Sequence, residues 1–443
     1  MDSAAREALA ARVLALSNAD ETEVMVWSGN DALTRFTHNM VHQNVAVADV
    51  SVRVRAIMGK RTGVATTNVL DQAALRETVS RAIEMANLAP EDPDLPRLPA
   101  GGAVESPEGA YIEGTANATP QTRAHMCDAI FKTAEEHDYW CAGFATTSTS
   151  GVTVVNSSGA RASFDGTDSG VNVKMNAADS TGFAEGYDND VTRLDAHVIG
   201  SASARKARES AHPRGVSPGE WTVILEPAAF GELFSYLVDH FSAQAFDEGS
   251  SFLSDGLDKA YLGDNVTIAD DYAHPLNPGM PFDFEGQPTQ RLTLLENGVA
   301  KNIVTDSYWA SKLRRPNTGH ALPMPNAYGP QPGHVVVSPG SKPAAQLIAE
   351  TKHGLLITRF WYIRTVDQKK AIVTGMTRDG TFLIENGEIA GGVRNMRFNQ
   401  SIIEALRRCE FANALHRTGG YSYSLVVPTV KIEGFTFSSG TEF

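Results

Sequence analysis

The segment "EVMVWSGNDALTRFTHNMVHQNVAVADVSVRVRAIMGKRTGVATTNV" (residues 23–69) decides the fold class of this chain. Several of its runs alternate apolar and polar residues, as half-buried antiparallel strands do. The runs are EVMVWSG, ALTRFTH, NVAVADVSVRVRAIMG and RTGVATTNV, and all of them precede the next predicted helix. The segment therefore predicts a β-sheet near the N-terminus.

Predicted helices flank this sheet segment on both sides. Residues 1–20 have the pattern of an amphipathic helix, and residues 71–89 repeat Ala, Leu, Val and Ile at helical spacing. Asp71 is a suitable N-cap for the second helix. The stretch "PEDPDLPRLPAGG" (90–102) is rich in Pro and Gly and predicts a linker. A first domain is therefore expected at residues 1–90.

A second domain is predicted at residues 105–212. A helix at 119–137 opens it and a helix at 190–211 closes it. Between them lie strands rich in Ser and Thr, which the turn signals "NSSGA" (156–160) and "DGTDSG" (165–170) divide into a β-meander.

The third and largest domain is predicted at residues 220–443. It begins with a strand and the helix "EPAAFGELFSYLVDHFSAQAF" (226–246), and it ends in a strand-rich tail. Turns are predicted in that tail at "RDGT" (378–381), "ENGE" (385–388) and "IEGF" (432–435). Strands and helices are interspersed without a regular βαβ rhythm. The chain is therefore expected to be α+β, with a mixed β-sheet in the N-terminal region and a large, strand-rich C-terminal domain with interspersed helices.

The overall composition narrows the classes of partner. The 443 residues include 38 Lys and Arg against 52 Asp and Glu, a formal net charge of −14, which disfavours a broad nucleic-acid surface. No run approaches the roughly 18–20 apolar residues of a membrane span, and the N-terminus lacks the features of a signal peptide. The three cysteines are widely spaced and form no disulfide framework. We therefore expect a cytoplasmic chain that binds neither nucleic acid nor membrane.

Common catalytic motifs are missing from the sequence. It contains no HExxH, GxSxG, GxxxxGK[ST] or clean GxGxxG. His38 and His42 are four residues apart, but they fall between strand-like runs, where side chains at that spacing diverge. His320 and Asn317 lie in the Gly/Pro loop "NTGHALPMPN" (317–326). Loops of this kind often line sites, so these two residues are candidates for a cavity or a substrate-binding position.

Several long segments resemble the TldD/PmbA family. "GLLITRFWYIRTVDQKKAIVTGMTRDGTFLIENGEIAGGVRNMRFNQSIIEAL" (354–406) resembles the C-terminal domain of that family. "PFDFEGQPTQRLTLLENGVAKNIVTDSYWASKL" (281–313) and "NTGHA" (317–321) match in the same order, and "GKRTGVATTN" (59–68) is similar as well. PmbA chains are also called TldE, and older descriptions call the family modulators of DNA gyrase. The resemblance spans nearly the whole chain and implies a metallopeptidase family member.

The resemblance also implies where a zinc site would lie. TldD-type members carry HExxxH on a helix just after a strand, and a Cys near the C-terminus. Two imidazoles and a third ligand hold Zn²⁺ there, and the Glu takes a proton from the attacking water. When "VILEPAAFGELFSYLVDHF" (223–241) is laid along that motif, Ser235 falls on the first His, Tyr236 on the Glu and His240 on the second His.

No replacement for the C-terminal Cys is expected. "RTGGYSYSLVVP" (417–428) has Gly and Tyr in that region. Cys409 lies earlier, in the predicted helix "SIIEALRRCEF" (401–411), where packing is its expected role. The resemblance therefore implies a PmbA/TldE-type chain without catalytic residues or metal ligands, with zinc in a TldD-like partner. The helix around the motif carries an apolar stripe suited to burial, formed by Phe230, Phe234, Leu237, Phe241 and Ala245.

The function implied by the resemblance is that of the non-zinc subunit in a cytoplasmic metallopeptidase heterodimer. Such a complex would enclose and cleave short or unfolded peptides, in peptide maturation and in the degradation of small labile proteins. A homodimer is the alternative assembly. A protein-binding regulator without hydrolysis stays open, as does an autonomous hydrolase whose site has moved toward His320, His240 and Asp239. The residues do not identify the peptide substrate.

Overall fold

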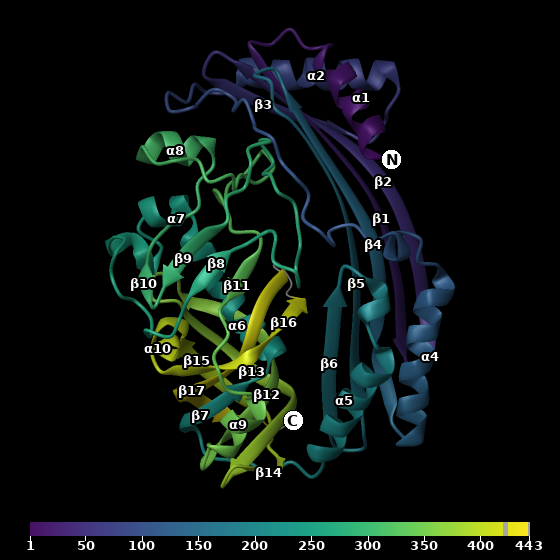
Figure 1. The fold of residues 1–443 in the computed structure, drawn as a ribbon, viewed down its shortest axis with the longest axis vertical. Helices are drawn as coiled ribbons and strands as arrows, with labels where there is room; N and C mark the ends of the chain where they lie inside the picture. Colours follow the sequence, from purple (N-terminus) through teal and green to yellow (C-terminus); the bar gives the residue numbers. More distant parts are fainter. Residues whose placement is uncertain (420–423, 442–443) are drawn as a thin grey trace.

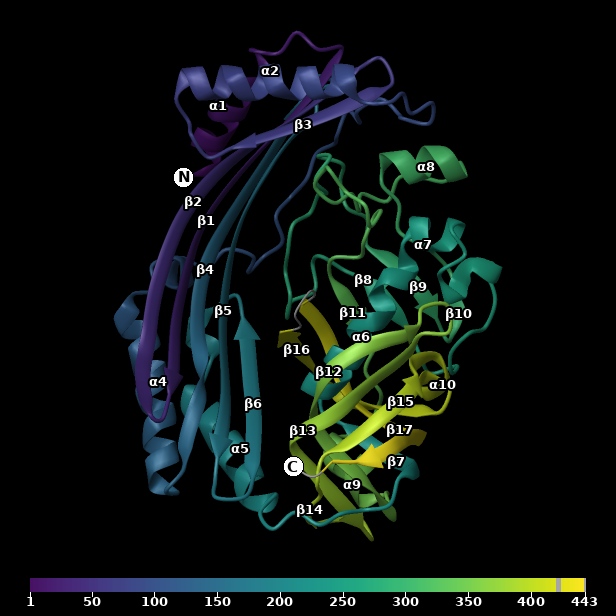
Figure 2. The same cartoon turned by 180° about the vertical axis from the view of Figure 1, so that it is seen from behind.

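Two β-sheets face each other in the computed structural model, which describes residues 1–419 and 424–441 (Figure 1). One sheet is long and curved, and the other lies at the centre of the C-terminal part (Figures 1 and 2). Strands and helices are interspersed, so the predicted α+β class is confirmed. Residues 420–423, which belong to the stretch compared above with the family's C-terminal Cys, lie outside the described residues. Within the described chain, no helix is long and apolar enough to cross a membrane.

The N-terminal sheet has six strands in the order β3-β2-β1-β4-β5-β6, and every neighbouring pair is antiparallel. Its strands are β1 (Glu21–Thr37), β2 (Met40–Met58), β3 (Arg61–Thr67), β4 (Trp140–Asn156), β5 (Arg161–Asn176) and β6 (Thr181–Asp188). The helices that cover its outer face are α1 (Ser3–Leu14), α2 (Gln72–Leu88), α4 (Pro120–Glu136) and α5 (Ala196–Glu209), and the short α3 (Glu113–Ala116) precedes α4 (Figure 2). The N-terminal sheet is therefore purely antiparallel, and among the described residues parallel strand pairs occur only in the C-terminal sheet described below.

The strands of the first two predicted domains share this one sheet. β1 pairs with β2 on one side and with β4 on the other. Residues 1–90 and 105–212 therefore do not form separate sheets. A stretch rich in Pro and Gly indicates an irregular connection, but it does not show whether that connection joins two domains or two parts of one sheet.

The N-terminal sheet is built from unusually long strands. β1, β2, β4 and β5 contain 17, 19, 17 and 16 residues, against about five or six in an average strand. The turn predicted at "DGTDSG" (165–170) is wrong, because these residues continue β5 opposite β4. A Cβ at Gly166 or Gly170 would lie 2.9 or 2.6 Å from the ring of Phe164 or Tyr187, respectively. The glycines thus permit close packing instead of a chain reversal.

The C-terminal sheet has eleven strands and is mixed. Its strands are β7 (Gly219–Leu225), β8 (Ile268–Asp270), β9 (Leu292–Glu296), β10 (Val299–Ala300), β11 (Val335–Val337), β12 (His353–Asp367), β13 (Ile372–Glu385), β14 (Glu388–Gly392), β15 (Met396–Ser401), β16 (Cys409–Gly419) and β17 (Ser424–Gly440). β7 pairs with β12, and β11 with β17, in parallel. The helices of this part are α6 (Pro227–Val238), α7 (Ala243–Asp247), α8 (Ser307–Leu313), α9 (Ala344–Ala349) and α10 (Ile402–Leu406).

Two of the turns predicted in this sheet are bulges. "RDGT" (378–381) lies inside β13, where Asp379 and the glycine after it have positive φ and oppose a single residue of β12. "IEGF" (432–435) lies inside β17, where the register against β7 shifts in the same way. An extra residue bends a strand without reversing it, which explains both errors. The turn predicted at "ENGE" (385–388) is confirmed, because it joins β13 to β14.

Two predicted helices are shorter in the structure. The helix expected at 226–246 ends at Val238, and a 3₁₀ turn at Asp239–Phe241 separates it from α7. The helix expected at 190–211 begins only at Ala196, where Asp195 caps its first turn. The predicted stripe lies in the core except for its last, half-buried member, with Phe230, Phe234, Leu237 and Phe241 fully buried and Ala245 at the edge.

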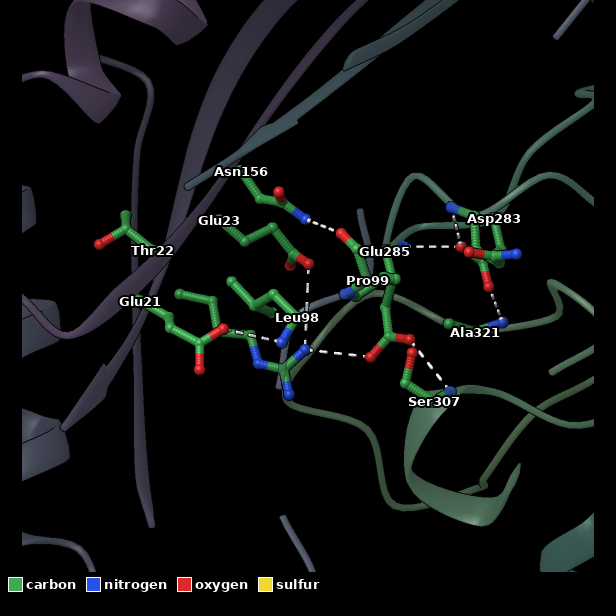
Figure 3. Close-up of polar contacts among 12 residues, drawn as sticks. Glu21, Thr22, Glu23, Leu98, Pro99, Asn156, Asp283, Glu285, Ser307 and Ala321 are labelled. Carbon is green, nitrogen blue, oxygen red and sulfur yellow. Dashed lines mark hydrogen bonds and ion pairs between the residues drawn. The ribbon is translucent and has the colours of Figure 1, made fainter. Parts of the chain in front are cut away.

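A buried ion cluster joins the N-terminal sheet to a loop of the C-terminal part (Figure 3). Arg55 of β2 lies 3.9 Å from Glu23 of β1 and 3.1 Å from Glu285 of the C-terminal part. Asp283 accepts a hydrogen bond from the backbone N–H of Ala321, at 2.9 Å. We call Glu23, Arg55, Asp283 and Glu285 the Arg55 cluster. Because its members come from both halves of the chain, it holds the halves together.

A second set of ion pairs joins the sheets farther along β5. Arg417 of β16 contacts Asp168 at 2.7 Å, and Lys174 contacts the bulge residue Asp379 at 3.4 Å. Asp379 also accepts a hydrogen bond from the hydroxyl of Thr181 on β6, at 2.9 Å. The bulge in β13, which the sequence predicted as a turn, therefore directs the carboxylate of Asp379 toward the N-terminal sheet.

Candidate functional site

Helix α6 carries the three positions that were compared with the zinc motif. It follows β7 directly, with Pro227 at its first position, where the missing N–H of proline leaves no hydrogen bond unmade. One face of α6 is buried in the core. The residues of the opposite face share helical spacing and are partly or fully exposed, namely Ala228, Glu232, Ser235, Tyr236 and Asp239. We call this face the α6 stripe.

Ser235 and Tyr236 on the α6 stripe make hydrogen bonds within the fold. The hydroxyl of Ser235 donates to the backbone oxygen of Glu232 at 2.8 Å. The hydroxyl of Tyr236 donates to the backbone oxygen of Ile363 on β12 at 2.7 Å. Burial raises the pKa of Tyr236, so the phenol is protonated at neutral pH and acts as a donor. The residue at the Glu position therefore cannot serve as a base.

His240 points into the core instead of along the stripe. His240 is 1% exposed, and the Nδ1 atom of its imidazole accepts a hydrogen bond from the backbone N–H of Phe252 at 3.3 Å. The imidazole and the Phe252 ring lie 5.2 Å apart between centroids. Burial lowers the pKa of His240 to about 4, so the ring is neutral at pH 7. Its role in this fold is to fix the turn at Ser251–Phe252.

These residues do not fit a zinc ion. A peptidase zinc site needs three protein ligands and an open position for water. His240 uses a ring nitrogen for a backbone N–H, and Ser235 and Tyr236 are hydroxyls engaged as donors. In residues 1–419 and 424–441, no group of three or more His, Cys, Asp or Glu side chains could hold a metal ion. No zinc-dependent step is therefore assigned to the described part of this chain.

Cys409 lies in a strand, so its assignment to a helix is wrong. Helix α10 ends at Leu406, and Cys409 begins β16. Its thiol donates to the backbone oxygen of Leu406 at 3.5 Å. Burial raises the pKa of Cys409 to about 12, which keeps the sulfur protonated. A packing role agrees with this environment.

His320 and Asn317 hold a loop against its neighbours. His320 is 4% exposed, with Nδ1 2.9 Å from the Thr318 hydroxyl and Nε2 3.7 Å from Asp270. The amide of Asn317 donates to the Ser307 hydroxyl at 3.0 Å. Neither residue lines the pocket that lies beside the α6 stripe. A role for them in substrate binding stays a prediction.

A pocket of about 470 Å³ lies where the two sheets meet. Its walls come from β6, α5, the first turn of α6 and β16. Its volume falls in the range of small-ligand sites, about 300–1,000 Å³. The polar and ionisable side chains in its wall that matter below are Glu185, Tyr187, Lys206, Glu226, His416 and Arg417.

The cations of the pocket already have partners. Lys206 contacts Glu226 at 2.6 Å and also donates to the backbone oxygen of Phe183 at 3.1 Å. Arg417 is paired with Asp168, as described above. Burial lowers the pKa of His416, so this imidazole adds no charge at neutral pH. The pocket therefore offers no unpaired cation from these three residues.

Two glutamates beside the pocket have no ion-pair partner among the described residues. Glu185 lies in the pocket wall on β6, and Glu232 lies on the α6 stripe. Burial raises the pKa of each to about 7, and the nearby charge of Arg359 opposes the shift in both. Arg359 is held by Asp379 at 2.9 Å and lies 4.3 Å above the Phe183 ring. Carboxyl groups with such pKa values beside a pocket can bind a cation or exchange a proton near neutral pH.

Sequence patterns gave little indication of this site. Glu232 offers one signal, because it is a charged residue inside the apolar run "AAFGELF" (228–234). Glu185 and Arg359 offer none, since they come from distant strands and meet only across the junction of the sheets.

Comparisons with known proteins bear on the same regions. A family model described as the PmbA/TldA metallopeptidase C-terminal domain matches residues 218–439, and one described as PmbA/TldA metallopeptidase domain 1 matches residues 23–86. The first match alone covers half of the chain.

Individual relatives agree with these matches. The metalloprotease PmbA of Escherichia coli O157:H7 is 27% identical over 242 residues, which are 53% of this chain and 51% of that protein. The PmbA homolog of Haemophilus influenzae is 29% identical over 249 residues, again 53% of this chain and 51% of that protein. The chain thus spans about half the length of these relatives. The crystal structure of TldE from Thermococcus kodakarensis covers 98% of this chain and 99% of its own, with a TM-score of 0.89 and 22% identity, which shows the shared fold.

Proposed function

Because domain models of that family match it, this chain belongs to the PmbA/TldD metallopeptidase family, and we propose that it acts as the non-zinc subunit of a heterodimeric peptidase. In this proposal a TldD-like partner supplies the zinc ion and the general base. The two chains together enclose short or unfolded peptides, and this chain is catalytically inert alone.

The state of the three motif positions carries this proposal. Ser235, Tyr236 and His240 each make a hydrogen bond that belongs to the fold, and they provide neither a second imidazole nor a carboxylate base at the motif positions. Zinc in the partner would lower the pKa of its bound water and polarise the scissile carbonyl. The residues of this chain would instead shape the enclosure and hold the peptide.

The free edge of the N-terminal sheet supports a role in holding extended chains. β3 pairs with β2 only at Val52–Met58, so within the described chain residues 40–51 of β2 have a strand neighbour on the β1 side alone. Val45 and Val47 on this stretch are 38% and 54% exposed. A peptide or a partner strand could add to such an edge through backbone hydrogen bonds, without a sequence requirement.

We also place this complex in the cytoplasm. Cys127, Cys141 and Cys409 are all free thiols, which supports a reducing compartment.

The proposal is tested by measuring zinc and peptidase activity for this chain alone and mixed with a TldD-like chain from the same organism. We expect a zinc-to-chain ratio near zero alone, a one-to-one complex on size exclusion, and hydrolysis of an unstructured fluorogenic peptide only in the mixture. Replacing the Glu of the partner's HExxxH motif by Gln should abolish hydrolysis, whereas Tyr236→Phe in this chain should preserve it. Zinc near one per chain, or hydrolysis by this chain alone, would overturn the proposal.

One alternative has an observation in its favour. Glu185 and Glu232 have pKa values near 7 beside a pocket, as a general acid and base would. An autonomous hydrolase would use them, and not the predicted His320, His240 and Asp239, because His320 and His240 are buried in separate packing environments. Metal-independent hydrolysis by the isolated chain, lost in Glu232→Gln, would favour this alternative.

A further inference from the structure

The pocket between the sheets contains one carboxylate, that of Glu185, that is half-buried and forms no ion pair within the described chain. Glu185 has the Tyr187 hydroxyl at 3.5 Å and the backbone N–H of Gly419 as its polar neighbours. It forms no ion pair with any described residue, whereas Lys206, Arg417 and Arg359 each contact another carboxylate. A half-buried carboxylate keeps unused acceptor capacity in this arrangement, and a cation would satisfy it.

Apolar side chains line two other parts of the pocket wall. Leu194, Val198, Ile199 and Ala202 line it from the α5 side, and Leu276 and Leu415 line it from the C-terminal part. The carboxylates of the pocket wall do not converge on a metal site, because no group of three or more His, Cys, Asp or Glu side chains in the described chain could hold a metal ion. An organic cation brings its own apolar body, which these walls can bury.

We propose that this pocket binds a primary ammonium group attached to an apolar body, with Glu185 as its counter-ion. The amine would donate to the Glu185 carboxylate and, through a second N–H, to the Tyr187 hydroxyl. The α-amino end of a peptide and the side chain of a lysine share this chemistry. We infer that the α-amino end is the natural occupant, because the chain belongs to a peptidase family and a pocket of about 470 Å³ has room for the first residues of a peptide. That identification rests on the proposed function, whereas amine binding itself does not.

The charges around Glu185 decide how binding depends on pH. The ionisable groups that face it or share its pocket come from β6, α5 and its preceding loop, α6, β12 and β16, namely Tyr187, Asp188, Arg193, Asp195, Lys206, Glu226, Glu232, Arg359, His416 and Arg417. Burial outweighs these charges and raises the pKa of Glu185 to about 7. Affinity should therefore rise with pH through about 7, as Glu185 ionises. It should fall again above about 8 for an α-amine, but not for a lysine side chain, whose ordinary pKa is about 10.4.

Isothermal titration calorimetry on the full chain, without any partner, tests the proposal. The probes are the peptide amide Leu-Ala-Gly, its N-acetyl form, and N-acetyl-lysine amide. We expect the free amine to bind at least about tenfold more tightly than the acetylated peptide, the factor expected for one charge-assisted hydrogen bond. Binding of the lysine probe at pH 7 as tightly as the α-amine would contradict the assignment to a chain terminus.

Two variants separate the site from a general charge effect. Glu185→Gln keeps the shape of the side chain and should remove the preference for the free amine. Glu136→Gln, on the exposed side of α4, should leave it unchanged. Equal affinity for free and acetylated peptides, an unchanged Glu185→Gln variant, or no binding at millimolar concentration would overturn the proposal. Peptidase activity of the mixed chains tests the proposed function separately, so the two can fail independently.

Discussion

The Arg55 cluster and the pocket at Glu185 hold carboxyl groups with similar acidities in opposite surroundings. Burial raises the pKa of Glu23 in the cluster to about 7, the same value as for Glu185 in the pocket. In the cluster, Arg55 lies between the carboxylates of Glu23 and Glu285, and all three residues are buried. In the pocket, Glu185 borders open space and forms no ion pair with any residue that the structure describes. A raised pKa reports burial in both places, and only access to a cavity separates a structural group from a candidate binding group.

The difference also separates two contributions to the fold. The Arg55 cluster connects the halves through charges that neither half could leave unpaired in a buried site. Near the pocket, the ion pairs Arg417–Asp168 and Lys174–Asp379 make that connection, and Glu185 takes no part in it. Substitutions in the cluster should therefore affect stability most, and substitutions of Glu185 should affect ligand binding most.

Arg55→Met should have the largest effect on stability. It leaves Glu23 and Glu285 buried without their cation, so we expect the free energy of unfolding to fall by about 3–5 kcal/mol. The loss should shrink toward about pH 5, where the carboxyls can take up protons. Urea denaturation measures both. Arg61→Met is the control, because Arg61 and Glu91 form an exposed pair at 3.1 Å that is worth about 1 kcal/mol or less. Equal losses in the two variants would contradict a connecting role for the cluster.

Gly182→Ala, near the pocket, should have an intermediate effect on stability. A Cβ at Gly182 would lie 2.1 Å from the backbone oxygen of Ser203 and 2.4 Å from the backbone nitrogen of Ala207. Helix α5 would have to move away from β6, which should cost about 1–3 kcal/mol and weaken amine binding in the pocket. Gly215→Ala is the matched control, since nothing lies within 4 Å of its Cβ position. If Gly182→Ala had the same free energy of unfolding as Gly215→Ala, helix α5 would be able to move away from β6 at no cost, and this prediction would be wrong.

The pH dependence of stability should show the smallest effect. Glu185 has a pKa of about 7 in the folded chain, above the ordinary value of 4.5. Between these values the folded state binds more protons than the unfolded state, so this group makes the free energy of unfolding fall as pH rises. Glu185→Gln cannot titrate, and its fall should be smaller by about 2 kcal/mol, which is less than the about 3 kcal/mol that the full pKa shift would give, because Glu185 is only half-buried. Chemical denaturation from about pH 5 to 8 measures this. The free energy of unfolding of Glu136→Gln should depend on pH as that of the unmodified chain does. If Glu185→Gln showed the same dependence, the Glu185 carboxyl would be exposed to solvent and not buried.

Local patterns predicted the elements whose contacts are local. Alternation located β1 and β2, helical spacing located α2 and α4, and Asp71 caps α2 as expected, since its carboxylate accepts from the backbone N–H of Ala74 at 2.8 Å. The turn at 385–388 was predicted for the same reason. Such features depend on neighbours within a few residues, and the sequence carries them directly.

The turn predictions failed at Asp-Gly pairs, because these residues occur both in turns and inside strands. Asp-Gly pairs indicate turns, but inside β5 the glycines at 166 and 170 make room for aromatic rings, and inside β13 Asp379 forms a bulge. Whether a chain reverses at such a pair depends on the strand beside it, which is not a local property.

By itself, the sequence determined the α+β class, the buried stripe of α6 and the family to which the chain belongs. These depend on periodicity along the chain and on the identity of residues in matching order. Only the tertiary structure decided that the first two predicted domains share one sheet, that Arg55 connects the halves, and that Glu185 borders a pocket. Each of these rests on residues far apart in the sequence that meet only when strand register and sheet curvature are set, and no local pattern encodes that meeting.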